Sequence, residues 1–165
     1  MSSSGARPST AAARIRRRRD VVGVPEPPGP FSWSVAYREL VFLSGIRGID
    51  PATGRPDEDD ESRIRRIFAH LVALLEANGS SPRHVLSTRV YVTDMARHRP
   101  LVNAAFTRFF GAELPARTIV EVRALNQEDT IELEAVAARP RRPATRSRTG
   151  SSRAVRHPGR GGAGS

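Results

Sequence analysis

An arginine in a short apolar segment is the first residue whose position suggests chemistry. The segment 115–122 reads PARTIVEV, and its β-branched residues indicate a strand. Alternate side chains of a strand share a face. Because the apolar Val120 and Val122 should meet the helices, we expect Arg117 to point to the opposite face of the sheet. A guanidinium there could bind a carboxylate through two parallel hydrogen bonds.

Two glutamates lie in the next apolar segment, 130–137, which reads TIELEAVA. Apolar residues alternate with Glu132 and Glu134, so both carboxylates should lie on the face that is not packed on helices. Arg117 and these carboxylates could therefore share one face, where a glutamate could position water or move a proton. The same pattern also fits an ordinary cross-strand ion pair, and the residues alone leave both interpretations open.

Other catalytic or cofactor-binding motifs are absent from the sequence. There is no phosphate-binding glycine loop, no HExxH and no GxSxG, and Ser44 has no base beside it in sequence. The acidic run 57–61 precedes a predicted helix, and we interpret it as favourable charge at a helix N-terminus rather than as a metal site. We expect each histidine to lie on the surface or in the packing: His70, His84, His98 and His157.

The charge is distributed unevenly along the 165 residues. Residues 1–20 hold six arginines and one aspartate, residues 21–138 hold 13 arginines and 16 acidic residues, and residues 139–165 hold eight arginines and no acidic residue. The formal net charge of +10 therefore comes from the two ends. We interpret 1–20 and 139–165 as disordered arginine-rich tails, because they contain too few apolar side chains to offset the entropy of ordering. Such tails could attract polyanions weakly, in a salt-dependent way.

The composition also bears on location. The chain has no cysteine, which excludes disulfides, thiolate metal sites and a cysteine nucleophile. No apolar run has the length of a membrane span, so we expect a soluble, cytoplasmic protein with no membrane partner. The arginine- and serine-rich composition of residues 1–20 is also compatible with an organelle transit peptide, and that alternative stays open.

The stretch 21–138 shows the periodicities of two helices and five strands. Helices are predicted at about 60–78 and 100–110, where apolar residues recur every three or four positions and a glycine follows. Strands are predicted at 31–37, 40–45, 85–93, 117–123 and 130–137. The order β-β-α-β-α-β-β with two amphipathic helices predicts a two-layer α+β sandwich. One face of its sheet stays uncovered, and oligomerisation is the natural way to cover it.

The order of short motifs within 21–138 resembles the reactive intermediate deaminase family, also called the Rid or YjgF-type family. The most specific part is the PAR-T-x-V-E-V strand followed by IELEA. The motifs, in order, are PFS at 30–32, VFLSG at 41–45, DPATG at 50–54, VYVTD at 90–94, VN at 102–103, FFG at 109–111, PAR at 115–117 and IELEA at 131–135.

This resemblance implies a chorismate-mutase-like fold and a homotrimer, in which three sheets form a central barrel with three clefts between subunits. It implies hydrolysis of reactive enamines and imines, such as 2-aminoacrylate, to 2-keto acids and ammonia. No metal or organic cofactor is implied. The expected partners are other copies of the chain and a small 2-imino or 2-keto acid.

The resemblance also implies roles for individual residues. Arg117 matches the arginine that grips the substrate carboxylate, and Glu132 matches the glutamate that orients the attacking water or moves a proton. Ser44 and Gly45 match the loop that lines the cleft, and Asn103 matches a cleft asparagine. In a trimer, each cleft would bring Arg117 and Glu132 together with groups from the neighbouring subunit.

Two cleft positions depart from the family pattern. Phe31 stands where archetypal deaminases have tyrosine, and Ile119 stands where they often have cysteine. The cleft is therefore expected to be more apolar, which leaves open a second interpretation, a non-catalytic trimer that binds a small carboxylate. An RNA-associated role would rest on the tails alone. The PAR and IELEA motifs point away from chorismate mutase itself.

Overall fold

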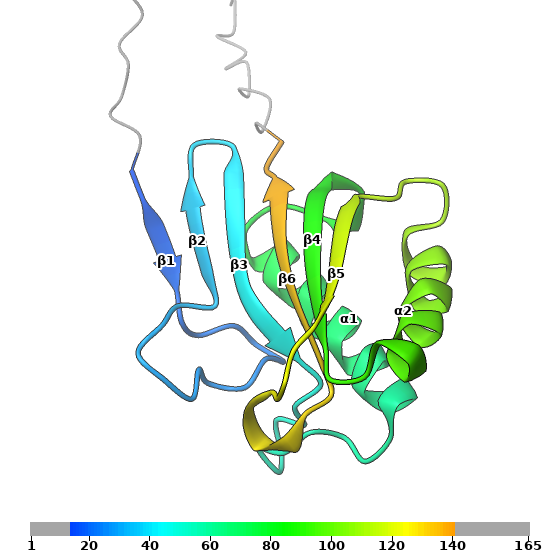
Figure 1. Cartoon of the computed structure of the whole chain (residues 1–165). Helices are drawn as coiled ribbons and strands as arrows, with labels where there is room; N and C mark the ends of the chain where they lie inside the picture. The colour runs from blue at the N-terminus through cyan, green and yellow to red at the C-terminus, as the bar shows by residue number, and fades with distance from the viewer. Residues whose placement is uncertain (1–13, 141–165) are drawn as a thin grey trace, which may run out of the picture.

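The computed structural model describes residues 14–140, and in this part of the chain six strands form one sheet with two α-helices packed on it (Figure 1). The strands are β1 (Arg16–Arg18), β2 (Ser34–Tyr37), β3 (Leu40–Arg47), β4 (Val85–Val92), β5 (Ala116–Glu121) and β6 (Ile131–Ala138). The helices are α1 (Asp60–Ala77) and α2 (Met95–Phe110), and single 3-10 turns occupy Pro82–His84 and Asn126–Glu128. The predicted α+β sandwich is confirmed.

The sheet has the strand order β1-β2-β3-β6-β4-β5. The pair β4–β5 is parallel, because α2 connects these strands as a crossover, and the other neighbours are antiparallel. The helices cover one face, with α1 behind the sheet and α2 beside the β5 edge in Figure 1. The C-terminal strand β6 therefore runs through the middle of the sheet, between β3 and β4.

The strand β1 lies in a region that we predicted to be a disordered tail. Residues 16–18 pair antiparallel with 34–36 of β2 and form the edge of the sheet, so the prediction is wrong for this part of the N-terminal segment. Backbone hydrogen bonding orders this stretch despite its charge, because its arginine side chains remain exposed to solvent. Residues 1–13 and 141–165 of the two predicted tails lie outside the described residues.

The second helix begins earlier than predicted. Asp94 caps its N-terminus by accepting a hydrogen bond from the backbone N–H of Arg97 at 2.9 Å, so the helix starts at Met95 instead of about residue 100. Pro100 therefore lies inside the helix and not in its first turn. Gly111 ends the helix with a φ of +57°, as its position predicted.

The core lies between the helices and one face of the sheet. Strand β6 alternates buried and half-buried residues along its whole length, which confirms the predicted alternation of IELEAVAA. The predicted apolar face of α1 is also confirmed, since all six of its members are buried: Ile64, Ile67, Phe68, Leu71, Leu74 and Leu75. Each such side chain stabilises the fold by about 1.5–3 kcal/mol relative to exposure to water.

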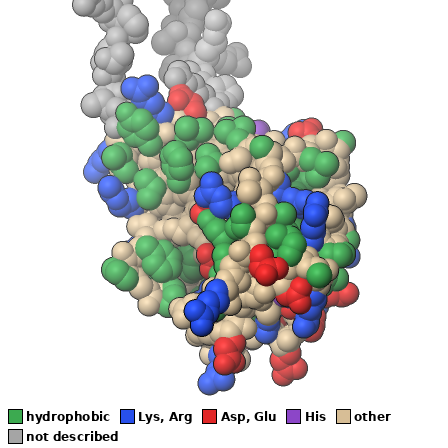
Figure 2. Space-filling view, in the orientation of Figure 1, with side chains coloured by type: hydrophobic (Ala, Val, Ile, Leu, Met, Phe, Trp, Pro, Cys, Tyr) green, Lys and Arg blue, Asp and Glu red, His purple; other side chains and the backbone are tan. Residues whose placement is uncertain are grey.

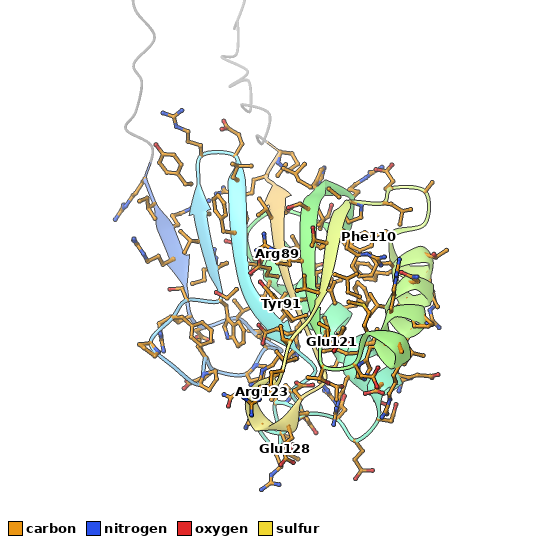
Figure 3. All side chains as sticks on the ribbon, in the orientation of Figure 1. Arg89, Tyr91, Phe110, Glu121, Arg123 and Glu128 are labelled. Carbon is orange, nitrogen blue, oxygen red and sulfur yellow. The ribbon has the colours of Figure 1, made fainter. Side chains whose placement is uncertain are left out.

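The opposite face of the sheet, which we call the open face, carries exposed apolar side chains. Leu40 and Phe42 of β3 are 38% and 46% exposed, and Figure 2 shows apolar side chains across this face with arginines at its β1 edge. Arg89 of β4 forms an ion pair with Glu134 of β6 on the same face, where Figure 3 labels Arg89 and Tyr91. In the described part of the chain, neither helix is long and apolar enough to cross a membrane.

The end of β3 packs tightly on the first turns of α1. A Cβ atom at Gly48 would lie 2.6 Å from Cα and 2.7 Å from the backbone oxygen of Arg63. Because backbone atoms cannot rotate away, Gly48→Ala should force β3 and α1 apart and lower the free energy of unfolding by about 1–3 kcal/mol in urea denaturation. Gly29→Ala is the control, since its Cβ would meet the Phe31 ring at an ordinary 3.4 Å. Equal stabilities of the two variants would contradict this packing constraint.

Candidate active site

A cavity of about 420 Å³ opens where the end of β3 meets the segment 25–33 and the turn at 126–127. Four of the seven predicted site residues line it, namely Phe31, Ser44, Gly45 and Glu132. The other lining residues are Pro25, Glu26, Pro28, Trp33, Arg47, Ile49, Gly54, His70, Asn126 and Gln127. The cavity thus combines an aromatic wall with one buried arginine and a carboxylate.

The aromatic wall is fixed by hydrogen bonds to the backbone of the segment 25–33. Trp33 donates from Nε1 to the Pro25 carbonyl at 2.7 Å and packs edge-on against the Phe31 ring at 5.4 Å between centroids. Ser44 donates its hydroxyl to the Ser32 carbonyl at 2.7 Å. Arg19, just after β1, donates to the carbonyls of Gly29 and Phe31. The hydroxyl of Ser44 therefore stabilises the wall of the cavity through its hydrogen bond to the backbone of Ser32.

Glu132 occupies space that only a glycine neighbour leaves free. A Cβ atom at Gly45 would lie 2.2 Å from Oε1 and 2.6 Å from Cδ of Glu132. Gly45 lies in the irregularity of the β3–β6 pairing between Leu43 and Ile46, so the backbone of β3 approaches the carboxylate from the side. The absence of a Cβ at Gly45 thus leaves room for the Glu132 carboxylate at the wall of the cavity.

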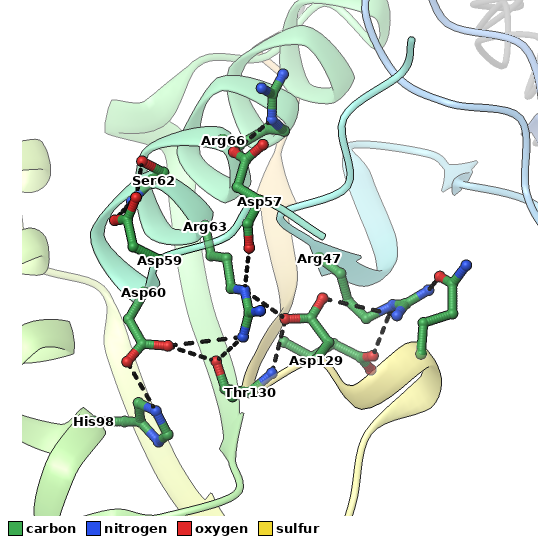
Figure 4. A network of polar contacts seen from close by, with 12 residues as sticks. Arg47, Asp57, Asp59, Asp60, Ser62, Arg63, Arg66, His98, Asp129 and Thr130 are labelled. Carbon is green, nitrogen blue, oxygen red and sulfur yellow. Dashed lines mark hydrogen bonds and ion pairs between the residues drawn. The ribbon is translucent and has the colours of Figure 1, made fainter. Parts of the chain in front are cut away.

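Arg47 is the cation nearest to Glu132 within the cavity. Its Nε lies 3.9 Å from Oε2 of Glu132, and its other nitrogens donate to the Asn126 carbonyl at 2.6 Å and to Oε1 of Gln127 at 3.0 Å. Asp129, fully buried, lies 3.7 Å from the same guanidinium. Figure 4 shows how these contacts connect the end of β3 with the turn before β6.

The surroundings of Glu132 make it a weaker acid than usual. Burial raises the pKa of Glu132, the charge of Arg47 lowers it, and Asp129 and Glu134 raise it further, so that the pKa lies above its ordinary value. A carboxylate with a raised pKa accepts a proton more readily, which is what a general base in a water-poor site requires.

Arg117 lies on the other face of the sheet, contrary to our prediction. Its guanidinium donates to Oδ1 of Asn103 at 2.6 Å and lies 4.7 Å from the centre of the Phe106 ring, and both partners belong to α2. Ile119 packs against the core on the same side. The register explains this, because Arg117 pairs with the buried Thr88 of β4. Apolar residues occupy both faces of β5, so Val120 and Val122 did not indicate which face of this strand packs against the helices.

The predicted site residues therefore form two separate groups within one chain. Phe31, Ser44, Gly45 and Glu132 line the cavity by the open face, whereas Arg117, Asn103 and Ile119 lie at the β5–α2 edge. Burial and the nearby charge of Arg99 lower the pKa of Arg117, whose guanidinium contacts an amide oxygen and an aromatic ring rather than a carboxylate.

Sequence reasoning missed the polar residues around Glu132. Arg47, Gln127 and Asp129 fall in no motif, and only their position in space relates them to Glu132. His70 is buried, as a packing histidine should be, and its Nδ1 lies 3.2 Å from the Arg47 carbonyl, while burial lowers its pKa. Within residues 14–140, no group of three or more histidine, aspartate or glutamate side chains could hold a metal ion.

A second polar cluster lies behind the cavity, at the start of α1 (Figure 4). Arg63 lies 3.9 Å from Asp129 and donates to Oγ1 of Thr130 at 2.8 Å. Thr130 donates in turn to Asp60 at 2.8 Å, and Arg97 of α2 pairs with Asp60 at 2.7 Å. Asp59, from the acidic run 57–61, accepts a hydrogen bond from Ser62 N at 2.8 Å and caps α1, and Asp60 and Glu61 lie in the first turn. The run therefore lies at the N-terminus of the helix, as interpreted.

The chain is thus a small α+β protein with a carboxylate-bearing cavity at the end of strand β3 of its single sheet. The sequence profile of the endoribonuclease L-PSP family matches residues 23–139. The chain belongs to this family, which is the Rid or YjgF-type family that the motifs indicated.

Named relatives agree with this assignment. The chain is 35% identical over 114 residues to the 2-iminobutanoate/2-iminopropanoate deaminase of Salmonella typhimurium, covering 67% of this chain and 88% of the relative. It is also 35% identical over 114 residues to a RutC family protein of Pyrococcus horikoshii, covering 68% and 90%. Among solved structures, the YjgF gene product of Escherichia coli has a TM-score of 0.70 at 29% identity, covering 76% and 100%.

The environment of Asp60 predicts a pH-dependent contribution to stability. Burial alone would raise the pKa of Asp60, but the hydrogen bond from Thr130 and the electrostatic influence of His98 and Arg97 together hold it below its ordinary value. Asp60→Asn should therefore lower the free energy of unfolding by about 2 kcal/mol at pH 7, because hydrogen bonds to a charged group are strong.

The sign of this effect follows from the depressed pKa. The stabilisation is present above the unfolded-state pKa of about 4 and is lost as the pH falls through the folded-state value, so the two stabilities should converge below about pH 4. Urea denaturation across pH 3–7 measures this. Asp59→Asn is the matched control, since asparagine also caps a helix and its effect should be smaller. A constant difference for Asp60→Asn at all pH values would contradict the ionic origin.

Proposed function

We propose that this protein is a hydrolytic deaminase of reactive enamines and imines, acting on small 2-imino acids of the 2-aminoacrylate type. The observation that carries the proposal is Glu132, a half-buried carboxylate with a raised pKa at the wall of a small cavity. The name of the Salmonella relative, an iminobutanoate and iminopropanoate deaminase, supports the same chemistry. We propose Glu132 and Arg117 as its catalytic residues.

A homotrimer joins the two groups of site residues in this proposal. Arg117 and Glu132 lie on opposite faces of one sheet, so a single chain does not offer both to one substrate. The open face exposes Leu40 and Phe42, which are the kind of apolar surface that a subunit interface buries. In the trimer, the β5–α2 edge of one subunit would close the cavity of its neighbour and add Arg117, Asn103 and Ile119.

The substrate would bind by its carboxylate to Arg117 through charge-assisted hydrogen bonds. The imine carbon would then lie near Glu132 in the neighbouring subunit, with Phe31 against the apolar side chain of the substrate. Ser44 and the backbone of Gly45 line the same cavity and would contact the substrate there.

The reaction needs a water molecule and one site for proton transfer. The water oxygen forms a bond to C2 while Glu132 takes a proton from the water, and the electron pair of the C=N bond moves to nitrogen, which gains a proton. The hydroxyl group of the resulting amino alcohol then loses its proton to Glu132, which passes a proton to nitrogen. The C–N bond breaks, ammonia leaves, and the C=O bond of the 2-keto acid forms. Glu132 both accepts and returns a proton in this sequence.

A second candidate function is a non-catalytic trimer that binds a small carboxylate. The observation in its favour is the apolar wall, since Phe31 packs on Trp33 without offering a hydroxyl to the cavity. Arg117 would serve both functions equally, whereas the raised pKa of Glu132 favours the enzyme. Turnover of substrate distinguishes the two.

The proposal predicts that two inactive variants restore each other when their subunits mix. Arg117→Ala and Glu132→Gln should each lower kcat/KM by about 100-fold or more, because one loses the carboxylate contact and the other the base. In randomly mixed trimers about a quarter of the clefts are intact, so about a quarter of the wild-type activity should return. The assay follows 2-keto acid formation from 2-aminoacrylate or 2-aminocrotonate generated in situ by a dehydratase.

Controls fix the interpretation of that assay. Mixing equal amounts of wild-type subunits and an Arg117→Ala, Glu132→Gln double variant should leave about a quarter of the clefts intact, which is about half the activity of the wild type diluted to the same extent without mixing. Light scattering should give three times the mass of one chain for every protein used. No recovery of activity in mixed trimers would contradict a site shared between subunits, and an inactive wild-type trimer would favour the binding function.

A further inference from the structure

Arg47 is a buried cation in the cavity to which no sequence motif assigns a role. It is 8% exposed, ends β3 and pairs directly with Glu132 across the β3–β6 ladder. Among the described residues, 14–140, it is also the only arginine that lines the cavity. Because the two side chains project from paired positions on the same face, the Arg47 Nε lies 3.9 Å from the Glu132 carboxylate.

A turn with unusual backbone geometry holds the Arg47 guanidinium from the other side. The Asn126 carbonyl and Oε1 of Gln127 accept its hydrogen bonds at 2.6 Å and 3.0 Å. Gln127 and the next residue, Glu128, have φ angles of +56° and +57°, a region that residues other than glycine rarely adopt. Gln127 also donates to the Gly54 carbonyl at 3.1 Å, which ties this turn to the turn after β3.

Buried Asp129 completes the surroundings of Arg47. One of its oxygens lies 3.7 Å from Arg47 and the other 3.9 Å from Arg63, while its exposed surface is 1%. A buried carboxylate needs a cation nearby, and Asp129 has two. Arg47 is thus fixed by three groups of the segment 126–129, which leaves its Nε directed toward Glu132.

We propose that Arg47 is a positioning residue that keeps Glu132 ionised and oriented in the cavity, and that the segment 126–129 fixes Arg47 for this task. The inference deepens the proposed function and rests on it for its catalytic meaning. The electrostatic part stands on the contacts of Arg47 alone, so it is measurable whether or not the protein is a deaminase.

Burial and two neighbouring carboxylates oppose the ionisation of Glu132. Glu134 follows it on the same face of β6, Asp129 precedes it, and both carboxylates raise the pKa of Glu132, as does burial. Glu26 lines the cavity from the segment 25–33, and His70 lines it from α1, where burial lowers the pKa of the imidazole. Tyr91 pairs with Glu132 from β4. The positive charge of Arg47 is what offsets this environment.

The test is a pH titration of the Glu132 carboxyl carbon by NMR in the full chain, assigned with Glu132→Gln, beside the pH dependence of kcat for 2-aminoacrylate hydrolysis. Arg47→Met should raise the pKa of Glu132 by about one pH unit or more, because an opposite charge at this distance favours ionisation. The acidic limb of the kcat profile should move to higher pH by the same amount. Arg47→Lys keeps the charge and should restore both values in large part.

Two further variants keep the test decisive. Arg89→Met removes an arginine of the neighbouring strand that pairs with Glu134 and not with Glu132, and it should raise the pKa of Glu132 much less than Arg47→Met does. Gln127→Gly removes one anchor of Arg47 while relieving the positive φ, and it should raise the pKa of Glu132 less than Arg47→Met does. This milder variant carries the test if Arg47→Met fails to fold.

The outcomes distinguish the role of Arg47 from the proposed deaminase function. An unchanged pKa of Glu132 in Arg47→Met, or in Gln127→Gly where Arg47→Met fails to fold, would overturn the inference, whatever the activity. A raised KM with an unchanged pKa would instead make Arg47 a substrate contact and would also overturn it. If the pKa of Glu132 is raised in Arg47→Met but the wild-type protein hydrolyses no imine, the result would support the role of Arg47 and would count against the proposed function.

Discussion

The alternation of side chains along β-strands is the constraint on which the rest of this structure depends. It places Glu132 of β6 on the open face of the sheet and Arg117 of β5 on the helix face. Neither side chain is able to cross the sheet. In the proposed reaction, the substrate needs a cation for its carboxylate and a base that activates water beside its imine carbon. One chain would therefore supply only one of these groups to each substrate, and a second copy would supply the other.

Several features of the cavity offset the free-energy cost of burying the Glu132 carboxylate. Gly45 admits the Glu132 side chain by having no Cβ, and Arg47 offsets part of the loss of water. Arg47 is held by a turn with two positive φ angles, and Asp129 links that turn to Arg63 and the start of α1. A continuous network of polar contacts thus extends from the cavity to the helix layer, as Figure 4 shows.

The sequence predicted those features that depend on local periodicity. The apolar face of α1 and the alternation in β6 follow from repeats of 3.6 and two residues, and both agree with the structure. The N-terminus of α2 was placed too late because Pro100 suggested a first turn, whereas Asp94 supplies the cap. The strand β1 was missed because three consecutive arginines carry no apolar signal, although backbone pairing with β2 orders them.

The candidate site was predictable only in part, because some of its contacts depend on pairing between strands that are distant in the sequence. Residues in motifs, such as Ser44, Gly45 and Glu132, do meet in one cavity. The side to which Arg117 points depends on its register with β4, and the contact of Arg47 with Glu132 depends on pairing between distant strands. No short stretch of sequence contains either relation.

The most direct measurement is a crystal structure of the protein with a bound 2-keto acid, the product of the proposed reaction. The ligand carboxylate should lie against Arg117 of one subunit, with its carbonyl carbon beside Glu132 and Gly45 of the next. A ligand held by one chain alone, or a carboxylate bound to Arg47 with Arg117 uninvolved, would contradict a site shared between subunits.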